Sequence, residues 1–157
     1  MATKLFITAE NVKETTSISG TTDNDLINQK IYYAQISDIT RVLGQSLYDK
    51  IYSEKVADTL SGEYLNIFNK YIIDMHIFFT AYYFVAFNET KVSNVGNTIL
   101  TSEKYQPSQK TNQLAEQYKN LAVSVENNFR EYMKDSTLLE WGYCKKDEEI
   151  TNFNDFY

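Results

Sequence analysis

The apolar residues of this chain are densest between residues 63 and 88, where they follow a helical period. One stripe recurs at alternating steps of three and four residues and consists of Leu65, Phe68, Ile72, Met75, Phe79, Tyr82 and Ala86. Between Ile73 and Phe87 a second apolar set fills most of the remaining circumference. A helix that is apolar nearly all round lies at the centre of a helical domain or in a membrane. We therefore predict a central helix that other helices or other subunits cover.

A second helix is predicted from residue 23 to about Leu43, because the spacing of Thr22 and Asp25 resembles a capping box. At 100° per residue its apolar residues form two nearly opposite faces, one with Ile27, Ile31 and Ala34 and the other with Tyr32, Ile36, Ile39 and Leu43. We expect this helix to be sandwiched between two partners. Gly44 suits the position after a helix end, so a third helix follows over residues 45–57.

A fourth helix is predicted from Pro107 and Ser108 to about residue 134. Its apolar stripe consists of Leu114, Tyr118, Leu121, Val125, Phe129 and Tyr132. This helix is amphipathic, and it matches the central helix in length at roughly 26 residues or ~39 Å. We expect the two long helices to form an antiparallel pair.

The remaining segments are less regular. Thr8 can cap a brief helix over residues 10–14, and residues 15–22 read as a loop. Residues 90–103 break the helical period, and we predict a short β-hairpin insertion there. Residues 135–157 form an extended tail whose aromatic content predicts docking on this subunit or on a partner. The expected fold is thus all-α, a single domain over residues 1–157 with an N-terminal segment and loop (1–22), a four-helix core (23–134) and a docking tail (135–157).

The composition of the chain excludes some classes of binding partner and indicates where the protein is found. The chain has 157 residues, a net charge of −6 and no run of Lys or Arg, which argues against binding to a nucleic-acid backbone. It contains 13 Tyr and 9 Phe, and Tyr serves both cores and wet interfaces. Cys144 is the only cysteine, so an internal disulfide is excluded. The N-terminus has no signal-peptide core, and we expect an intracellular, reducing environment.

The chain offers little catalytic chemistry. His76 is the only histidine, and Asp74 lies on a different helical face, so we interpret His76 as a core or interface residue with one hydrogen bond. Cys144 has no second histidine to activate it, and phosphate-loop and nucleophile-elbow motifs are absent. We predict no enzymatic function, no cofactor and no metal site. With Asp74 and His76 inside the most apolar stretch and no basic flank, we also predict that it does not span a membrane.

The order of local patterns resembles a known family. The run from Ala34 to Ile51, which includes Leu43, Gly44, Leu47 and Tyr48, precedes a Tyr-rich long helix, residues 92–97 (VSNVGN) and a final amphipathic helix. This order, over residues 5–135, resembles the head-to-tail connector (adaptor) proteins of tailed bacteriophages, most of all the neck ring protein of crAss-like phages.

The resemblance implies a virion structural protein, found in the neck and assembled in the host cytoplasm. Such a subunit forms a homo-oligomeric ring, with twelve copies expected, below the portal protein and above further neck or tail rings. DNA passes through the ring without sequence-specific binding, which suits an acidic channel wall.

Two groups of residues are candidate contact sites. For docking onto a partner, with the portal as first candidate, they are Leu138, Leu139, Trp141, Tyr143, Phe153, Phe156 and Tyr157. For contact with an adjacent subunit or the channel, they are Val92, Asn94, Val95, Gly96 and Asn97. The alternatives are another non-enzymatic helical phage protein, such as a tail-completion or scaffold-associated factor, and a small-ligand-binding domain with an aromatic pocket near residues 78–87.

Overall fold

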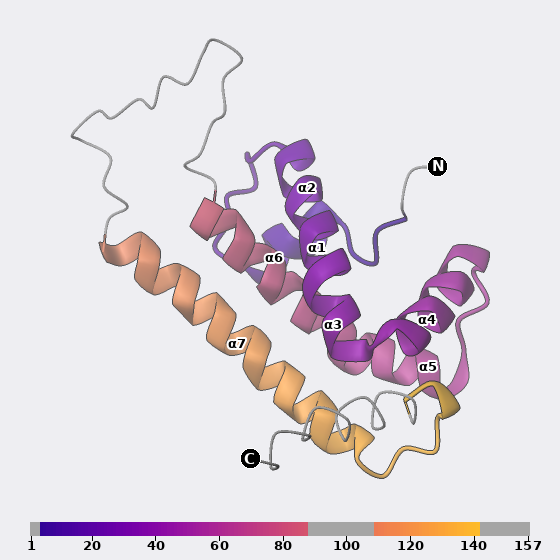
Figure 1. Ribbon diagram of the computed structural model, residues 1–157. Helices are drawn as coiled ribbons and strands as arrows, with labels where there is room; N and C mark the ends of the chain where they lie inside the picture. Colours follow the sequence, from indigo (N-terminus) through magenta and orange to yellow (C-terminus); the bar gives the residue numbers. More distant parts are fainter. Residues whose placement is uncertain (1–3, 88–108, 142–157) are drawn as a thin grey trace, which may run out of the picture.

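The computed structural model describes residues 4–87 and 109–141, and this part of the chain consists of helices and turns without a strand (Figure 1). The elements are α1 (Ala9–Thr15), α2 (Asn24–Ala34), the π-helical turn η1 (Gln35–Ile39), α3 (Thr40–Leu43), α4 (Gln45–Ala57), α5 (Gly62–Ile67), a second π-helical turn η2 (Phe68–Ile72), α6 (Ile73–Phe87) and α7 (Gln109–Met133). The predicted all-α class is confirmed. The hairpin predicted at residues 90–103 lies outside the described residues.

The long rod formed by α5, η2 and α6 is the centre of the domain. Figure 1 shows α6 between α2 and α7, with α7 running antiparallel along it as predicted. Side chains are buried on several sides of α6, at Met75, His76, Ile77, Phe79 and Phe84. The apolar circumference therefore indicated a central helix correctly. None of the helices in the described ranges is long and apolar enough to cross a membrane.

The predicted stripe of the central helix is wrong at its first residue. Leu65 is exposed, whereas Ile67 is fully buried. The turn η2 explains the difference, because a π turn inserts one extra residue and so sets the helical phase back by about 100°. Ile67 is thereby rotated onto the face that Ile72 and Met75 occupy after the turn. At the other end of the rod, Ala86 is also exposed.

The turn η1 acts in the same way on the second helix. Ile27 and Ile31 are buried before the turn, and Ile39 and Leu43 are buried after it. A regular α-helix would place the centres of these two pairs about 120° apart, but the extra residue of η1 brings them onto one face. The predicted second apolar face is thus only half correct, since Tyr32 and Ile36 remain exposed.

Several side chains donate hydrogen bonds to backbone carbonyls in and around η1. The Thr40 hydroxyl donates to the Gln35 carbonyl at 3.0 Å, and the Ser37 hydroxyl donates to the Tyr33 carbonyl at 2.6 Å. From the central helix, His76 Nε2 donates to the Ile31 carbonyl at 2.9 Å. The Ile31 and Gln35 carbonyls also accept backbone N–H groups, from Gln35 and Thr40 respectively, so the side chains add second hydrogen bonds there.

Helix α7 presents a different face to the core from the one predicted. Tyr118 and Phe129 are buried as expected, but the others of its most buried apolar side chains are Ala115, Ala122 and Met133. Alanine lets two helix backbones approach closely, so the line through Ala115 and Ala122 lies against the domain. Leu121 and Tyr132, both on the predicted apolar stripe, are exposed at the edge of this contact.

The helix ends follow local chemistry. Thr8 caps α1 in a capping box with Asn11. The cap of α2 is Asp23 and not Thr22, because the Asp23 carboxylate accepts the Asp25 backbone N–H at 2.9 Å. Gly44 joins α3 to α4 with a φ of 72°, as its position after a helix end predicts.

Candidate interaction surfaces

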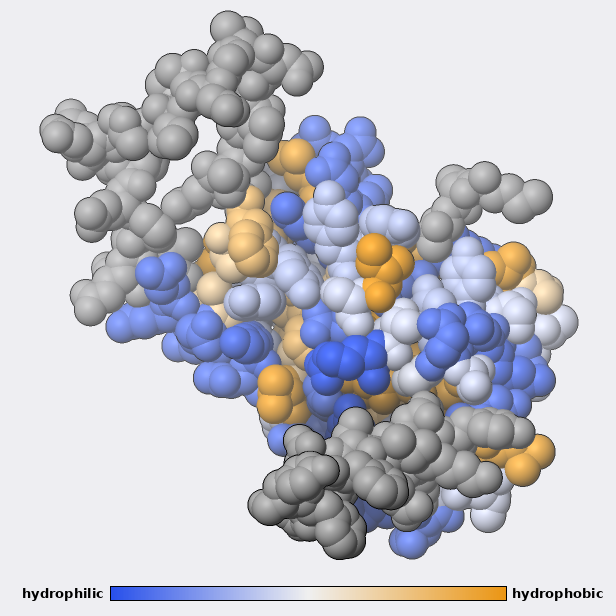
Figure 2. All heavy atoms as spheres, in the orientation of Figure 1, coloured by the Kyte–Doolittle hydropathy of each residue, from blue (hydrophilic) through white to orange (hydrophobic). Residues whose placement is uncertain are grey.

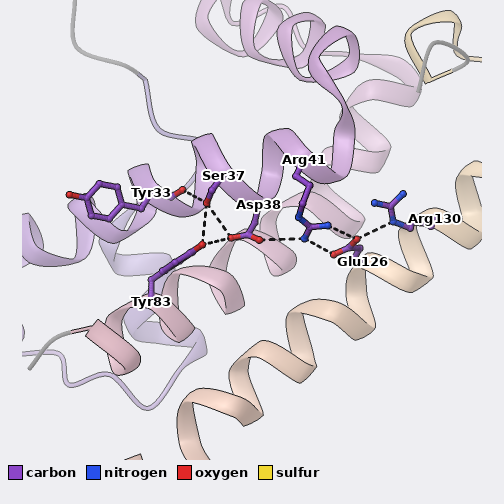
Figure 3. A network of polar contacts seen from close by, with 7 residues as sticks. All are labelled: Tyr33, Ser37, Asp38, Arg41, Tyr83, Glu126 and Arg130. Carbon is purple, nitrogen blue, oxygen red and sulfur yellow. Dashed lines mark hydrogen bonds and ion pairs between the residues drawn. The ribbon is translucent and has the colours of Figure 1, made fainter. Parts of the chain in front are cut away.

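A polar network joins α2, η1 and α3 to the last helix (Figure 3). Arg41 donates to both carboxylate oxygens of Glu126 at 3.0 Å, and Arg130 donates to Glu126 Oε1 at 3.0 Å. Arg41 also reaches Asp38 at 3.3 Å, and the Tyr83 hydroxyl donates to Asp38 at 2.8 Å. The two acids and the two arginines balance each other in charge. Because these residues come from the continuous helix α2–η1–α3, from α6 and from α7, the network holds these three helices together.

Burial and hydrogen bonding set the charge states in this network. Burial alone would raise the pKa of Glu126, but hydrogen bonds from Arg41 and Arg130 outweigh it and lower that pKa below its usual value. The pKa of Arg41 is raised, first by its hydrogen bonds to Glu126. The bidentate ion pair is therefore fully charged near neutral pH, as expected for a structural clamp.

His76 has a structural role that matches its interpretation from sequence. It is completely buried, and Nε2 carries the proton because the Ile31 carbonyl can only accept. Among the described residues, Nδ1 has no hydrogen-bond partner. Burial lowers the pKa of His76 to about 4, so the ring is neutral at physiological pH. Asp74 is exposed on another face, as predicted.

The outer side of α2 and η1 forms the first exposed apolar surface. We define the α2 face as Leu26, Gln29, Lys30, Tyr33 and Ile36, of which Leu26, Tyr33 and Ile36 are each exposed to between 42% and 48%. Lys30 Nζ lies 5.5 Å from the centre of the Tyr33 ring. Figure 3 shows the Tyr33 side chain pointing away from the polar network. No described part of the chain covers this face.

The end of α6 extends this surface. Tyr83 stacks on Phe87 with ring centres 5.8 Å apart, and Phe87 is half exposed. The Tyr83 hydroxyl lies 3.3 Å from the Ser37 hydroxyl, which places these rings beside η1. Figure 2 shows pale and orange residues over α2 and the end of α6, interrupted by hydrophilic ones.

The second exposed apolar surface lies on the last helix. We define the α7 flank as Leu114, Leu121, Val125 and Tyr132; Leu121 and Tyr132 are exposed, and the other two are half-buried. Tyr132 packs beside Tyr71 and donates from its hydroxyl to Glu63 at 2.7 Å. Lys70 Nζ lies 4.9 Å from the Tyr132 ring centre.

The residues predicted to dock on a partner do not share one environment. Trp141 is only 6% exposed and packs edge-on against Phe129 with ring centres 5.3 Å apart. The Tyr64 hydroxyl donates to Glu140 at 2.7 Å, and burial together with this bond raises the pKa of Tyr64 to about 12. The predicted tail therefore begins by docking on its own subunit.

Leu139 behaves differently, because it is 80% exposed beside these anchored residues, while Leu138 is half-buried. Among the predicted partner-binding residues that the structure describes, Leu139 is therefore the one whose side chain is largely exposed and can meet another protein. The remaining predicted contact residues lie outside the described part: Tyr143, Phe153, Phe156 and Tyr157 of the tail, and Val92, Asn94, Val95, Gly96 and Asn97 of the expected hairpin.

The structure gives no support to a pocket among the aromatic residues 78–87. Phe79 and Phe84 fill the core. One hollow of about 570 Å³, open to solvent, lies elsewhere and is lined by Leu5, Asp25, Asn28, Gln29 and Tyr32. Within the described ranges, no group of three or more His, Cys, Asp or Glu side chains is arranged to hold a metal ion.

These features define a small all-α domain with a central apolar helix and two exposed apolar surfaces. The chain belongs to a family of unknown function, DUF6712, whose model matches residues 39–149, from the end of η1 to beyond Trp141. No curated protein matches the chain, and no solved structure matches it.

Proposed function

We propose that this protein is a virion structural protein, a head-to-tail connector subunit that forms a ring between portal and tail around the DNA channel. In this role it has no catalytic task and needs no cofactor. It acts through its contacts with copies of itself, with the portal protein and with further neck or tail rings. It reaches the virion neck after assembly in the host cytoplasm.

The observation that carries the proposal is the run around Gly44, the sharpest part of the resemblance to phage connectors. In the fold, Leu43 and Leu47 are fully buried on either side of the glycine, and Tyr48 packs against the Phe6 ring at 5.5 Å. The run thus fixes the direction of α4 relative to the rest of the domain. A rigid junction of this kind suits a subunit whose shape must repeat around a ring.

The exposed apolar surfaces also favour an assembling protein. The α2 face and the α7 flank leave several large apolar side chains about half exposed, and Leu139 is more exposed still. Contiguous exposed apolar patches mark interaction sites in soluble proteins. The net charge of −6 favours a channel wall over which DNA slides without being held.

The decisive experiment is the mass of the full chain in solution, alone and mixed with a phage portal protein, by light scattering with electron microscopy of the product. We expect a ring, or binding that forms only on the portal. Leu139→Glu should weaken portal binding, whereas Val56→Glu, which changes an exposed apolar residue on α4, should not. A chain that stays monomeric and ignores every portal would contradict the proposal.

The second candidate, a small-ligand-binding domain, is favoured only by the open hollow beside α2. It predicts that a small molecule raises the melting temperature of the chain. A portal protein should then have no effect on that temperature.

A further inference from the structure

The segment before α1 fills a site that several other elements build. We define the strap as Lys4, Leu5, Phe6 and Ile7, which are neither helix nor strand. The Gln35 side chain, fully buried in η1, binds the strap through both ends of its amide. Its Oε1 accepts the Phe6 backbone N–H at 2.8 Å, and its Nε2 donates to the Lys4 carbonyl at 3.1 Å. One side chain thus pairs with two backbone groups, as a neighbouring strand does when a peptide is added to a sheet.

The strap is also held by contacts of its side chains. The Lys4 ammonium donates to the Lys55 carbonyl at 3.1 Å, near the end of α4, where the helix dipole favours a positive charge. The Lys4 backbone N–H donates to the Tyr52 hydroxyl at 3.1 Å. The Phe6 ring is 5% exposed and lies 5.5 to 6.2 Å from four other rings, those of Tyr48, Tyr52, Phe68 and His76. The site therefore holds a backbone and selects a lysine two positions before a phenylalanine.

The strap itself lies at the surface of the domain. Lys4 is exposed, and Leu5 is half-buried and borders the open hollow beside α2. In Figure 1 the strap runs along the edge of the domain before it enters α1. Segments at a chain end open locally at a lower free energy than packed helices do. The strap can therefore leave the site while the helices stay packed.

The structure shows which peptide fits this site, because the strap of the same chain fills it. A second copy carries an identical strap, which would make the same contacts. The effective concentrations of the two straps then decide which of them binds. The chain's own strap acts at about millimolar concentration, and the strap of a neighbour held in an assembly acts at a similar one. Exchange of an identical element between copies is a low-cost route to association.

We infer that the site around Gln35 is a peptide-binding site and that its second occupant is the strap of another copy of this chain. In the exchanged state the strap of one copy leaves its own site and enters the site of the other. The exchange joins two copies without using the α2 face or the α7 flank. It goes beyond the proposed connector role, because it requires only a second copy and no portal protein.

A pair of complementary variants tests the exchange. Phe6→Ala keeps the site but removes the ring that anchors the strap, whereas Gln35→Leu keeps the strap but removes both backbone bonds of the site. A tagged Phe6→Ala chain on a resin should retain the Gln35→Leu chain about tenfold more than it retains an untagged Phe6→Ala chain. Only the Gln35→Leu chain brings an intact strap that its own site does not hold. Any other contact between copies would retain the two chains equally.

A synthetic peptide measures the site without a second variant. The peptide has the sequence of residues 1–8 and a fluorescent label at its C-terminus, so anisotropy reports its binding. It should bind the Phe6→Ala chain about tenfold more tightly than the wild type, whose own strap competes. The same peptide with Phe6→Ala should bind about tenfold more weakly. The matched control is the Phe84→Ala chain, which loses another buried ring of α6 and should not bind.

Two results would overturn the inference. Equal peptide binding by the Phe84→Ala and Phe6→Ala chains would show that any loosened core binds an aromatic peptide. Peptide binding without preferential retention of the Gln35→Leu chain would rule out the exchange between copies. Circular dichroism checks that each variant is folded; Phe6→Leu replaces Phe6→Ala if the smaller side chain unfolds the domain, and the peptide measurement does not need Gln35→Leu. Neither experiment contains a portal protein, so the exchange and the connector function can fail separately.

Discussion

Acid should destabilise this protein through His76. The side chain is completely buried, its Nε2 is bound to the Ile31 carbonyl, and its pKa is lowered from 6.5 to about 4. In the unfolded chain the same ring titrates near 6.5, so between these two values the unfolded state binds more protons. The contribution of His76 is fully present above pH 6.5 and declines as the pH falls towards 4.

The size of the effect follows from the shift. One pKa unit corresponds to about 1.36 kcal/mol, so the shift of His76 corresponds to about 3 kcal/mol of unfolding free energy. Against a typical total of ~5 to 15 kcal/mol this loss is large. Carboxylates such as Glu126, whose pKa is also lowered, add their own loss of stability in acid. A histidine-free variant separates the two contributions.

Urea unfolding at pH 7 and at pH 4 measures the effect. Trp141 is the only tryptophan and lies in the core, so its fluorescence reports the transition. In His76→Gln the amide can still donate to Ile31, and the carboxylate contributions are unchanged. We expect the wild type to lose about 3 kcal/mol more than the variant between the two pH values. Parallel losses in both proteins would refute the reasoning, because the buried ring would then not resist protonation.

Three further predictions concern packing and backbone. Phe79→Ala removes a side chain buried between helices and should cost ~3 to 5 kcal/mol in urea unfolding; a loss below about 1 kcal/mol would place Phe79 outside the core. Gly44→Ala forces a Cβ into a backbone with φ 72° and ψ 157° and should cost about 2 kcal/mol, with an unchanged melting temperature as the contrary result. Truncation after Trp141 should leave the helical circular dichroism and the stability intact. Truncation before Leu138 also removes Trp141, which packs on Phe129, and should cost ~3 kcal/mol or more. Equal stability of the two truncated chains would show that Trp141 adds nothing to the core.

Long helices were predictable from the sequence because their periods extend over many turns. The central rod, predicted at residues 63–88, covers 62–87, and the last helix, predicted to end near residue 134, ends at Met133. The helix junction at Gly44 was also predictable, since a residue without Cβ is needed there. In each case a local signal decided the structure.

The differences between the predicted and the observed structure come from contacts between residues that are far apart in the sequence. A π turn adds a single residue to a helical turn, which a regular hydrophobic period does not reveal. The bond from His76 to the Ile31 carbonyl joins residues 45 positions apart. Arg41 and Glu126 are 85 positions apart, so no single-sequence signal pairs them. In α7 the small residues Ala115 and Ala122 are buried, whereas the larger Leu121 and Tyr132 of the predicted stripe are exposed. Trp141 is buried because it packs against Phe129, 12 positions earlier in the chain, with ring centres 5.3 Å apart.

The turn η1 links the fold to the proposed assembly. Without its extra residue, the second helix would carry two opposite apolar faces, and both would need a partner within the subunit. The turn rotates Ile39 and Leu43 onto the buried face and leaves Ile36 on the outer one. One side of the helix then completes the core, while the opposite side stays exposed. The second partner predicted for this helix is therefore not found within the described part of the subunit, and it stays a prediction.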